Sequence, residues 1–182
     1  YIIGSQATET SYQQLDFQHK LGKFWLVDLQ GKLSENNLET ENFNTRNYQI
    51  NSYAFQPKIS YVLNNDNRFS TFYHIKDKKN NLAEFKLLKQ QKIGIEYFYS
   101  RKSTTQFNAN FTTFFNDFDG NPNSPVGYQM LEGLQKGTNY TWAFLWNKKL
   151  NSYLNLSLNY KGRKSLNSKT IHTGSINLKA IF

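Results

Sequence analysis

Cysteine is absent from this 182-residue chain, and histidine occurs at only three positions, His19, His74 and His172. The lack of cysteine excludes disulfides, thiolate metal sites and cysteine nucleophiles. The histidines fall in different predicted strands without the spacing of metal ligands, and none stands near a serine in a recognisable catalytic arrangement. The sequence therefore predicts no catalytic residue, no metal site and no cofactor.

A long apolar segment is also absent. The mean hydropathy is -0.71, and no run of about 18 apolar residues occurs, which excludes a helical membrane protein. A closed β-barrel is then the remaining way for this composition to span a bilayer. Tyr1 to Ser5 lack the basic start and apolar stretch of a signal peptide, so we expect a mature product or a fragment.

Alternation between apolar and polar residues recurs along most of the chain. At the carboxyl end one face carries Gly174, Ile176, Leu178, Ala180 and Phe182, and the other carries Thr173, Ser175, Asn177 and Lys179. The same period of two covers 14–21, 25–33, 52–63, 68–76, 92–100, 106–115, 137–148 and 154–161. We expect about nine strands of roughly ten residues or more, the length that a tilted strand needs to cross a bilayer.

A soluble β-sandwich alternates in the same way, but two features favour lipid. Aromatic residues make up 16% of the chain, and many fall near strand ends, where membrane-interface girdles form. We predict these interface aromatics to be Trp25, Tyr61, Tyr97, Tyr99, Trp142, Trp146, Tyr160 and Phe182. Predicted short turns at 22–23, 64–67, 101–103 and 148–151 also alternate with long polar loops at 34–47, 117–136 and 161–169, an asymmetry typical of outer-membrane barrels.

The fold predicted from these patterns is all-β, an antiparallel transmembrane β-barrel region of nine or ten strands that occupies 1–182 without a separate soluble domain. If Phe182 ends at the periplasmic rim, the strand 12–21 starts outside the cell. Bacterial single-chain barrels have an even number of strands. We therefore expect this chain to be the carboxy-terminal part of a larger barrel, or to be completed by other subunits. Alternatively, residues 1–7 are the stub of a tenth strand.

A resemblance to known proteins supports an outer-membrane location. The terminal aromatic Phe182 resembles the closing residue of outer-membrane barrels. The segments 126–142 (VGYQMLEGLQKGTNYTW), 154–165 (LNLSLNYKGRKS) and 169–182 (KTIHTGSINLKAIF) are similar to the ends of large outer-membrane proteins of the Bacteroidota. The resemblance covers the last third of the chain and implies location and architecture, with no catalytic motif. It also implies membership of a larger assembly for protein secretion, nutrient import or barrel assembly.

The net charge of +9 favours binding of an anionic partner. We predict contacts with lipopolysaccharide phosphates from two predicted outer loops, since Lys and Arg bind such groups well. The candidates are Lys76, Lys78 and Lys79 in one loop and Lys161, Arg163, Lys164 and Lys169 in the other. A merely solvated loop is the alternative. Nucleic acid is not expected, because the cations are dispersed and no binding motif accompanies them.

Oxygen-bearing side chains at Asp117, Asp119, Asn121 and Asn123 match the first half of a calcium loop. Pro122 stands where the turn glycine belongs, so a turn-rich outer loop is favoured. The strand face predicted to line the aqueous interior, here called the wet face, carries Asp16, Asp28, Glu96, Lys20, Lys32, Lys58, Lys92 and Lys179. An interior with salt bridges is favoured over an open or plugged lumen.

Two functional hypotheses follow. The first is a non-enzymatic structural or transport component of an outer-membrane complex. The second is a barrel enzyme or receptor whose active part lies upstream.

Overall fold

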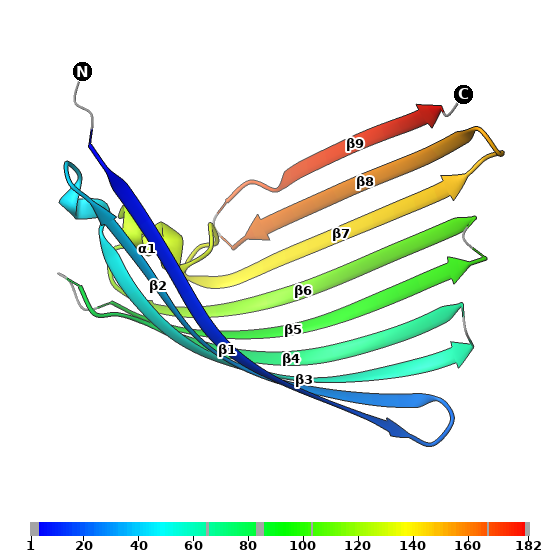
Figure 1. Cartoon of the computed structure of the whole chain (residues 1–182), viewed down its shortest axis with the longest axis horizontal. Helices are drawn as coiled ribbons and strands as arrows, with labels where there is room; N and C mark the ends of the chain where they lie inside the picture. Colours follow the sequence, from blue (N-terminus) through cyan, green and yellow to red (C-terminus); the bar gives the residue numbers. More distant parts are fainter. Residues whose placement is uncertain (1–3, 65, 83–85, 103, 167, 181–182) are drawn as a thin grey trace.

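Nine antiparallel strands form one sheet in the part of the chain that the computed structural model describes, residues 4–64, 66–82, 86–102, 104–166 and 168–180 (Figure 1). Each strand pairs with the next one in sequence. The strands are β1 (Gln6–Leu21), β2 (Trp25–Thr40), β3 (Tyr48–Asn64), β4 (Asn67–Asn80), β5 (Lys86–Arg101), β6 (Thr105–Asp119), β7 (Gly137–Lys149), β8 (Leu154–Ser165) and β9 (Ile171–Ala180). Two short helices interrupt the connections, η1 (Asn44–Arg46) and α1 (Pro125–Met130). Among the described residues, no helix has the length and apolar character needed to cross a membrane.

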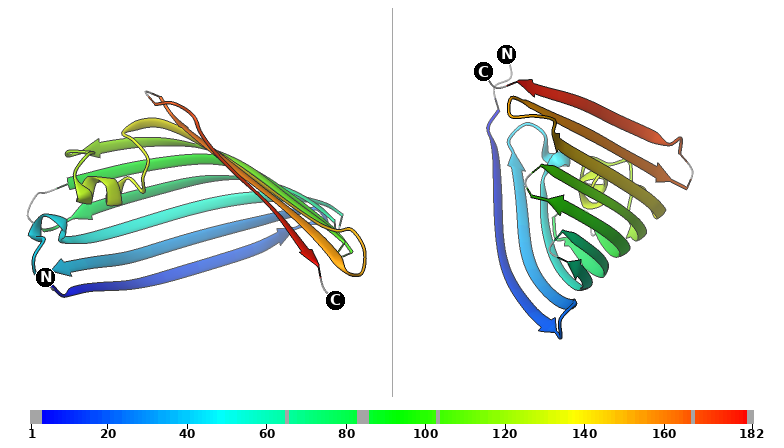
Figure 2. Two further views of the ribbon diagram at one scale, coloured as in Figure 1. Left: turned by 90° about the horizontal axis from the view of Figure 1, so that it is seen from above. Right: turned by 90° about the vertical axis from the view of Figure 1, so that its right-hand side faces the viewer.

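The sheet is curved, and α1 lies on its concave side (Figure 2). β1 and β9 are its two edges. Because every pairing along the sheet is antiparallel, an odd number of strands leaves β1 and β9 running in the same direction. The described sheet is therefore open, and its two edges cannot meet as an antiparallel pair.

The two faces of the sheet differ as the alternation predicts. The convex face exposes large apolar side chains on successive strands, including Phe17, Ile59, Phe69, Ile95 and Ile176. Ile176 has 74% of its surface exposed. Soluble monomers rarely expose apolar patches of this extent, whereas a barrel wall in lipid requires them. The opposite, concave face carries polar side chains such as Ser60, Ser70 and Gln90.

The connections alternate in length, as predicted. Short turns join β1 to β2, β3 to β4, β5 to β6 and β7 to β8, and the other end of the sheet, here called the loop end, carries 41–47, 81–85, 120–136 and 166–170. The predicted loops at 34–47, 117–136 and 161–169 start too early, because β2 continues to Thr40, β6 to Asp119 and β8 to Ser165. The predicted outer loop at Lys76–Lys79 is wrong, since β4 runs through these residues.

The buried apolar core is small and lies at the loop end. It comprises Tyr48, Ile50, Leu88, Phe118, Val126, Met130 and Leu131. These residues come from β3, β5 and β6 at the loop end of the sheet and from the β6–β7 loop. Buried apolar side chains of the described residues thus gather where this loop folds onto the concave face.

Candidate functional site

The β6–β7 loop, residues 120–136, folds inward against the concave face. Its helix α1 is capped by Ser124, whose hydroxyl oxygen accepts a hydrogen bond from the Gly127 backbone N–H at 3.0 Å, and Pro125 is the first residue of the helix. This is a capped helix start. Met130 and Leu131, at the end of the helix, are fully buried. Their burial holds the loop on the sheet.

Polar contacts from three strands fix the second half of this loop. Asn116 of β6 and Asn139 of β7 both donate side-chain amide N–H groups to the Gln135 carbonyl, at 3.0 and 2.8 Å. Asn139 also accepts from the Gln135 N–H at 3.0 Å. Arg163 of β8 donates to the Gly133 carbonyl at 3.3 Å. The loop is therefore held in a fixed position on the concave face by these hydrogen bonds and does not extend into solvent.

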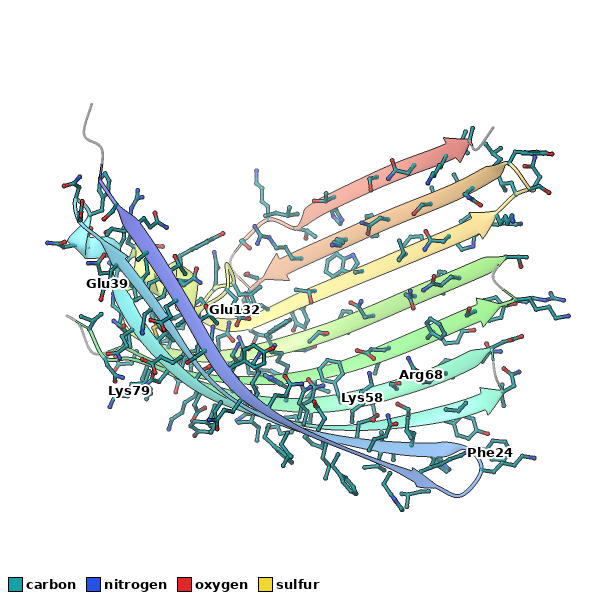
Figure 3. The ribbon with its side chains drawn as sticks, viewed as in Figure 1. Phe24, Glu39, Lys58, Arg68, Lys79 and Glu132 are labelled. Carbon is teal, nitrogen blue, oxygen red and sulfur yellow. The ribbon has the colours of Figure 1, made fainter. Side chains whose placement is uncertain are left out.

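Glu132 is the charged residue at the tip of this loop. One of its carboxylate oxygens, Oε1, accepts hydrogen bonds from Lys76 Nζ at 2.6 Å and Lys78 Nζ at 2.8 Å, and Lys78 also donates to the Met130 carbonyl at 2.8 Å. Figure 3 shows Glu132 where the loop meets the sheet. Burial favours the protonated form, but Lys78 and Lys76 outweigh it and lower the pKa of Glu132 to about 2. Glu132 is therefore a carboxylate at neutral pH.

Two further basic side chains adjoin this pair of lysines on the concave face. Lys92 of β5 lies opposite His74 of β4 in the strand register. Its ammonium nitrogen is 5.3 Å from the centroid of the Phe114 ring. The buried Nδ1 of His74 has no hydrogen-bond partner among the described residues. We call Lys76, Lys78, Lys92 and His74 the basic cluster.

A polar pocket of about 220 Å³ adjoins the basic cluster. Its walls come from β1 to β4 and consist mainly of amide, hydroxyl and ammonium side chains. The lining residues are Thr10, Tyr12, Gln30, Lys32, Ser34, Asn36, Ser52, Ala54, Phe55, Gln56, His74 and Lys76. Lys32 is 4.4 Å from the Tyr12 ring centroid. Because His74 and Lys76 line the pocket, the pocket and the basic cluster form one continuous site.

Nearer the turn end, the concave face carries paired charges. Lys58 of β3 forms an ion pair with Glu96 of β5, and Figure 3 shows Lys58 away from the loop end. Asp16 accepts hydrogen bonds from Gln14 and Gln30, at 2.7 and 2.8 Å. The sequence assigned Asp16, Lys58 and Glu96 to the wet face, and the structure confirms that placement.

The seven predicted lipopolysaccharide contacts separate into different places. Lys76 and Lys78 bind Glu132. Lys161 and Arg163 lie on β8 and alternate with Tyr160 and Gly162, so they share the concave face. Lys79 and Lys164 lie on the convex register at the loop end of β4 and β8, and Lys169 lies in the β8–β9 connection. Of the seven, only Lys169 lies in a connection as predicted, because β4 contains Lys79 and β8 contains Lys164.

The predicted interface aromatics lie on the convex face. The ring centroids of Trp25 and Tyr61 are 5.0 Å apart, and those of Tyr97 and Phe69 are 4.5 Å apart. These rings form a row near the turn end, which also includes Tyr99 and Trp146 on the same face. Trp142 and Tyr160 instead meet His172 further toward the loop end, with the Tyr160 hydroxyl 2.7 Å from His172 Nδ1. Phe182 lies outside the described residues.

The candidate calcium loop forms an Asx-turn, in which Asn121 Oδ1 accepts from the Asn123 N–H at 2.9 Å. The turn-rich interpretation is thus confirmed for Asn121 and Asn123, whereas Asp117 and Asp119 belong to β6. Among the described residues, no group of three His, Asp or Glu side chains is placed to hold a metal ion.

Sequence reasoning missed the central features of the site. Glu132 was assigned no role, and His74 was not placed on the wet face. The period of two could have identified His74, because it alternates with Tyr73 and Ile75.

No protein-family model and no curated protein matches this sequence. Solved structures do match it. OmpT expressed in the outer membrane of Vibrio cholerae has a TM-score of 0.61 and 10% identity over 86% of this chain and 46% of that chain. The variant of that protein lacking loop L8 has a TM-score of 0.63 and 9% identity over 94% of this chain and 53% of that chain. The trimer form of OmpT, folded in vitro, has a TM-score of 0.60 and 10% identity over 93% of this chain and 54% of that chain.

This chain thus spans about half the length of the outer-membrane proteins it matches. At such low identity the likeness shows the fold alone. The fold is a nine-stranded antiparallel wall of the outer-membrane β-barrel type, which confirms the fold class predicted from alternation.

Proposed function

We propose that this chain forms part of the wall of a bacterial outer-membrane β-barrel that transports solutes and is not itself an enzyme. The concave face lines an aqueous pathway, and the β6–β7 loop narrows it. One observation carries this proposal. A helix-bearing loop is fixed, through Met130, Leu131 and Glu132, on the polar face of a sheet whose other face is apolar and exposed.

The remaining wall comes from strands beyond this sheet. Edges that run in the same direction require an odd number of added strands for closure by antiparallel pairing. We propose that these strands precede β1 in a longer protein of the Bacteroidota, or belong to partner subunits of an outer-membrane complex. The matched structures support this, because each is about twice as long as this chain. The short turns and Phe182 then face the periplasm.

Lipopolysaccharide is the lipid partner that we propose for the outer rim. Lys79, Lys164 and Lys169 support it, because they stand at the loop end on the convex side or in a connection. Anionic headgroup phosphates and these ammonium groups would form charge-assisted hydrogen bonds.

Conductance tests the transport function. The full-length protein is purified from outer membranes in detergent, its intact mass is measured, and it is inserted into planar bilayers. We expect an ion-conducting pathway. Replacing 120–136 with a short glycine and serine connection should raise the single-channel conductance, because the constricting loop is gone.

Retention of the folded, heat-modifiable form in gels is the control for this variant. Correctly folded protein that inserts without conducting would overturn the transport proposal. An unchanged conductance in the shortened variant would overturn the role of the loop.

A further inference from the structure

Two ammonium groups converge on a single oxygen of Glu132. Lys76 and Lys78 approach Oε1 from the same strand, two residues apart, so both project from the concave face of β4. Only 7% of the Lys78 side chain is exposed. An arrangement of two cations around one carboxylate oxygen is a preformed site for an anionic oxygen.

The positive charge at this position exceeds the charge of Glu132. Lys76, Lys78 and Lys92 together carry three positive charges, and the loop supplies one carboxylate. Lys92 lies beside the uncharged Phe114 ring, and this contact does not neutralise its positive charge. The site therefore holds a surplus of positive charge on a partly desolvated wall, where its attraction for an anion is stronger than in water.

The polar pocket beside the basic cluster gives a solute access to it. Lys32 lies in the pocket wall, which contains no Asp or Glu among its lining residues. Its amides and hydroxyls, from residues such as Gln30, Gln56 and Ser52, can bind the polar part of a small solute. A volume of about 220 Å³ is enough for a small organic anion.

The backbone of Glu132 has a φ of 55°, a left-handed conformation that is uncommon for residues other than glycine. Such a conformation persists where surrounding contacts determine it, and the hydrogen bonds from Lys76 and Lys78 to the Glu132 carboxylate are contacts of this kind. Buried Met130 and Leu131 hold the adjoining chain independently. The loop can thus stay docked when the carboxylate leaves the lysines.

We infer that the basic cluster is a binding site for the carboxylate or phosphate of a small solute in the lumen, and that Glu132 is an internal competitor occupying the same lysines. This inference rests on the proposed transport function, because it assumes that solutes reach the concave face. The ligand is a free solute and not a lipid, because these lysines lie on the face opposite the apolar surface.

Binding of inorganic phosphate and of acetate to the full-length protein in detergent tests the inference without any need for conductance. Titration followed by calorimetry gives the affinity. Glu132→Gln should bind phosphate about tenfold more tightly, because a charge-assisted competitor is removed. Lys78→Met and Lys92→Met should each weaken binding by about tenfold or more. The two anions show whether phosphate or carboxylate is preferred.

Lys148→Met is the matched control, since it removes an exposed lysine from the convex register of β7 at the turn end and should leave phosphate binding unchanged. Folding of every variant is checked by heat-modifiability in gels. Lys92→Met provides a second test if Lys78→Met fails to fold. Among the described residues, the ion pairs of Glu132 are with Lys76 and Lys78 and not with Lys92.

Weaker phosphate binding by Glu132→Gln, or wild-type binding by folded Lys78→Met and Lys92→Met, would overturn the inference. Anion binding in a protein that conducts no ions would instead overturn the transport function and leave the site established. Conductance with no anion binding would overturn the site alone.

Discussion

The indole ring of Trp142 on β7 covers Gly162, the residue directly opposite it on β8. A Cβ atom at position 162 would collide with the ring. The ring also reaches toward His172 on β9, with centroids 5.9 Å apart. Phe72 covers Gly94 in the same way on the concave face. An aromatic ring over a strand glycine shields backbone that would otherwise be bare and fixes the register of the pair.

Gly162→Ala should therefore destabilise the folded barrel by about 1–3 kcal/mol, the usual cost of an overpacked site. The added methyl group forces Trp142 off Gly162 and away from His172. The measurement is the midpoint of urea unfolding in detergent, followed by tryptophan fluorescence. Gly174→Ala is the matched control on the neighbouring strand, because its nearest contact would be an ordinary 3.8 Å. Equal midpoints for the two variants would contradict the prediction.

Alternation in the sequence was sufficient for the strands and faces within the apolar band. It failed at the loop end, where the last residues of β2 (34–40) and β4 (76–80) are polar on both faces except for Leu38. A period of two has no contrast there, although the backbone pairing continues. Lys76, Lys78 and Lys79 were consequently assigned to one loop, whereas β4 places the first two on one face and Lys79 on the other.

The inward position of the β6–β7 loop could not be predicted locally. Nothing in the segment 120–136 marks Met130 and Leu131 as buried, and their core partners Leu88 and Phe118 lie on strands β5 and β6. Glu132 likewise binds lysines more than 50 residues away. Such contacts depend on the curvature of the sheet, which the period of the sequence does not encode.

Docking of the loop should depend on its buried side chains. Met130 is completely buried, and Met130→Ala should cost the docked loop about 2–5 kcal/mol by leaving a cavity. We expect faster cleavage within 120–136 by an added protease, with the barrel strands still protected. Tyr128→Ala, two residues away in α1, removes a side chain that is 62% exposed and should leave the cleavage rate unchanged. Equal cleavage of both variants would show that Met130 does not hold the loop.

The ion pair between Lys58 and Glu96 should contribute modestly to stability, because the side chains keep 22% and 39% of their exposure. A double-mutant cycle of Lys58→Met and Glu96→Gln should give a coupling energy of about 0.2–1 kcal/mol, as for exposed ion pairs. In planar bilayers, Glu96→Gln should also shift the reversal potential toward anion selectivity, since it removes a negative charge from the pathway. A shift toward cations would argue that Glu96 does not face the conducting path.

Acid should release the tip of the loop only at very low pH. Lys78 and Lys76 lower the pKa of Glu132 from its usual 4.5 to about 2. A carboxylate with a lowered folded-state pKa stabilises the fold fully above its unfolded-state pKa, and this contribution is lost as the pH falls through the folded-state value. The part of the conductance that depends on Glu132 should therefore stay constant from pH 7 to 4.5 and change between pH 4.5 and 2.

Glu132→Gln is the comparison, because it carries no titrating group at this position. Subtracting its pH profile from that of the wild type isolates Glu132 from other carboxylates such as Asp16 and Glu96. The difference between the two profiles therefore reports the Glu132 carboxylate. A difference centred near pH 4.5 or above would mean that Lys76 and Lys78 do not hold Glu132 in the conducting protein.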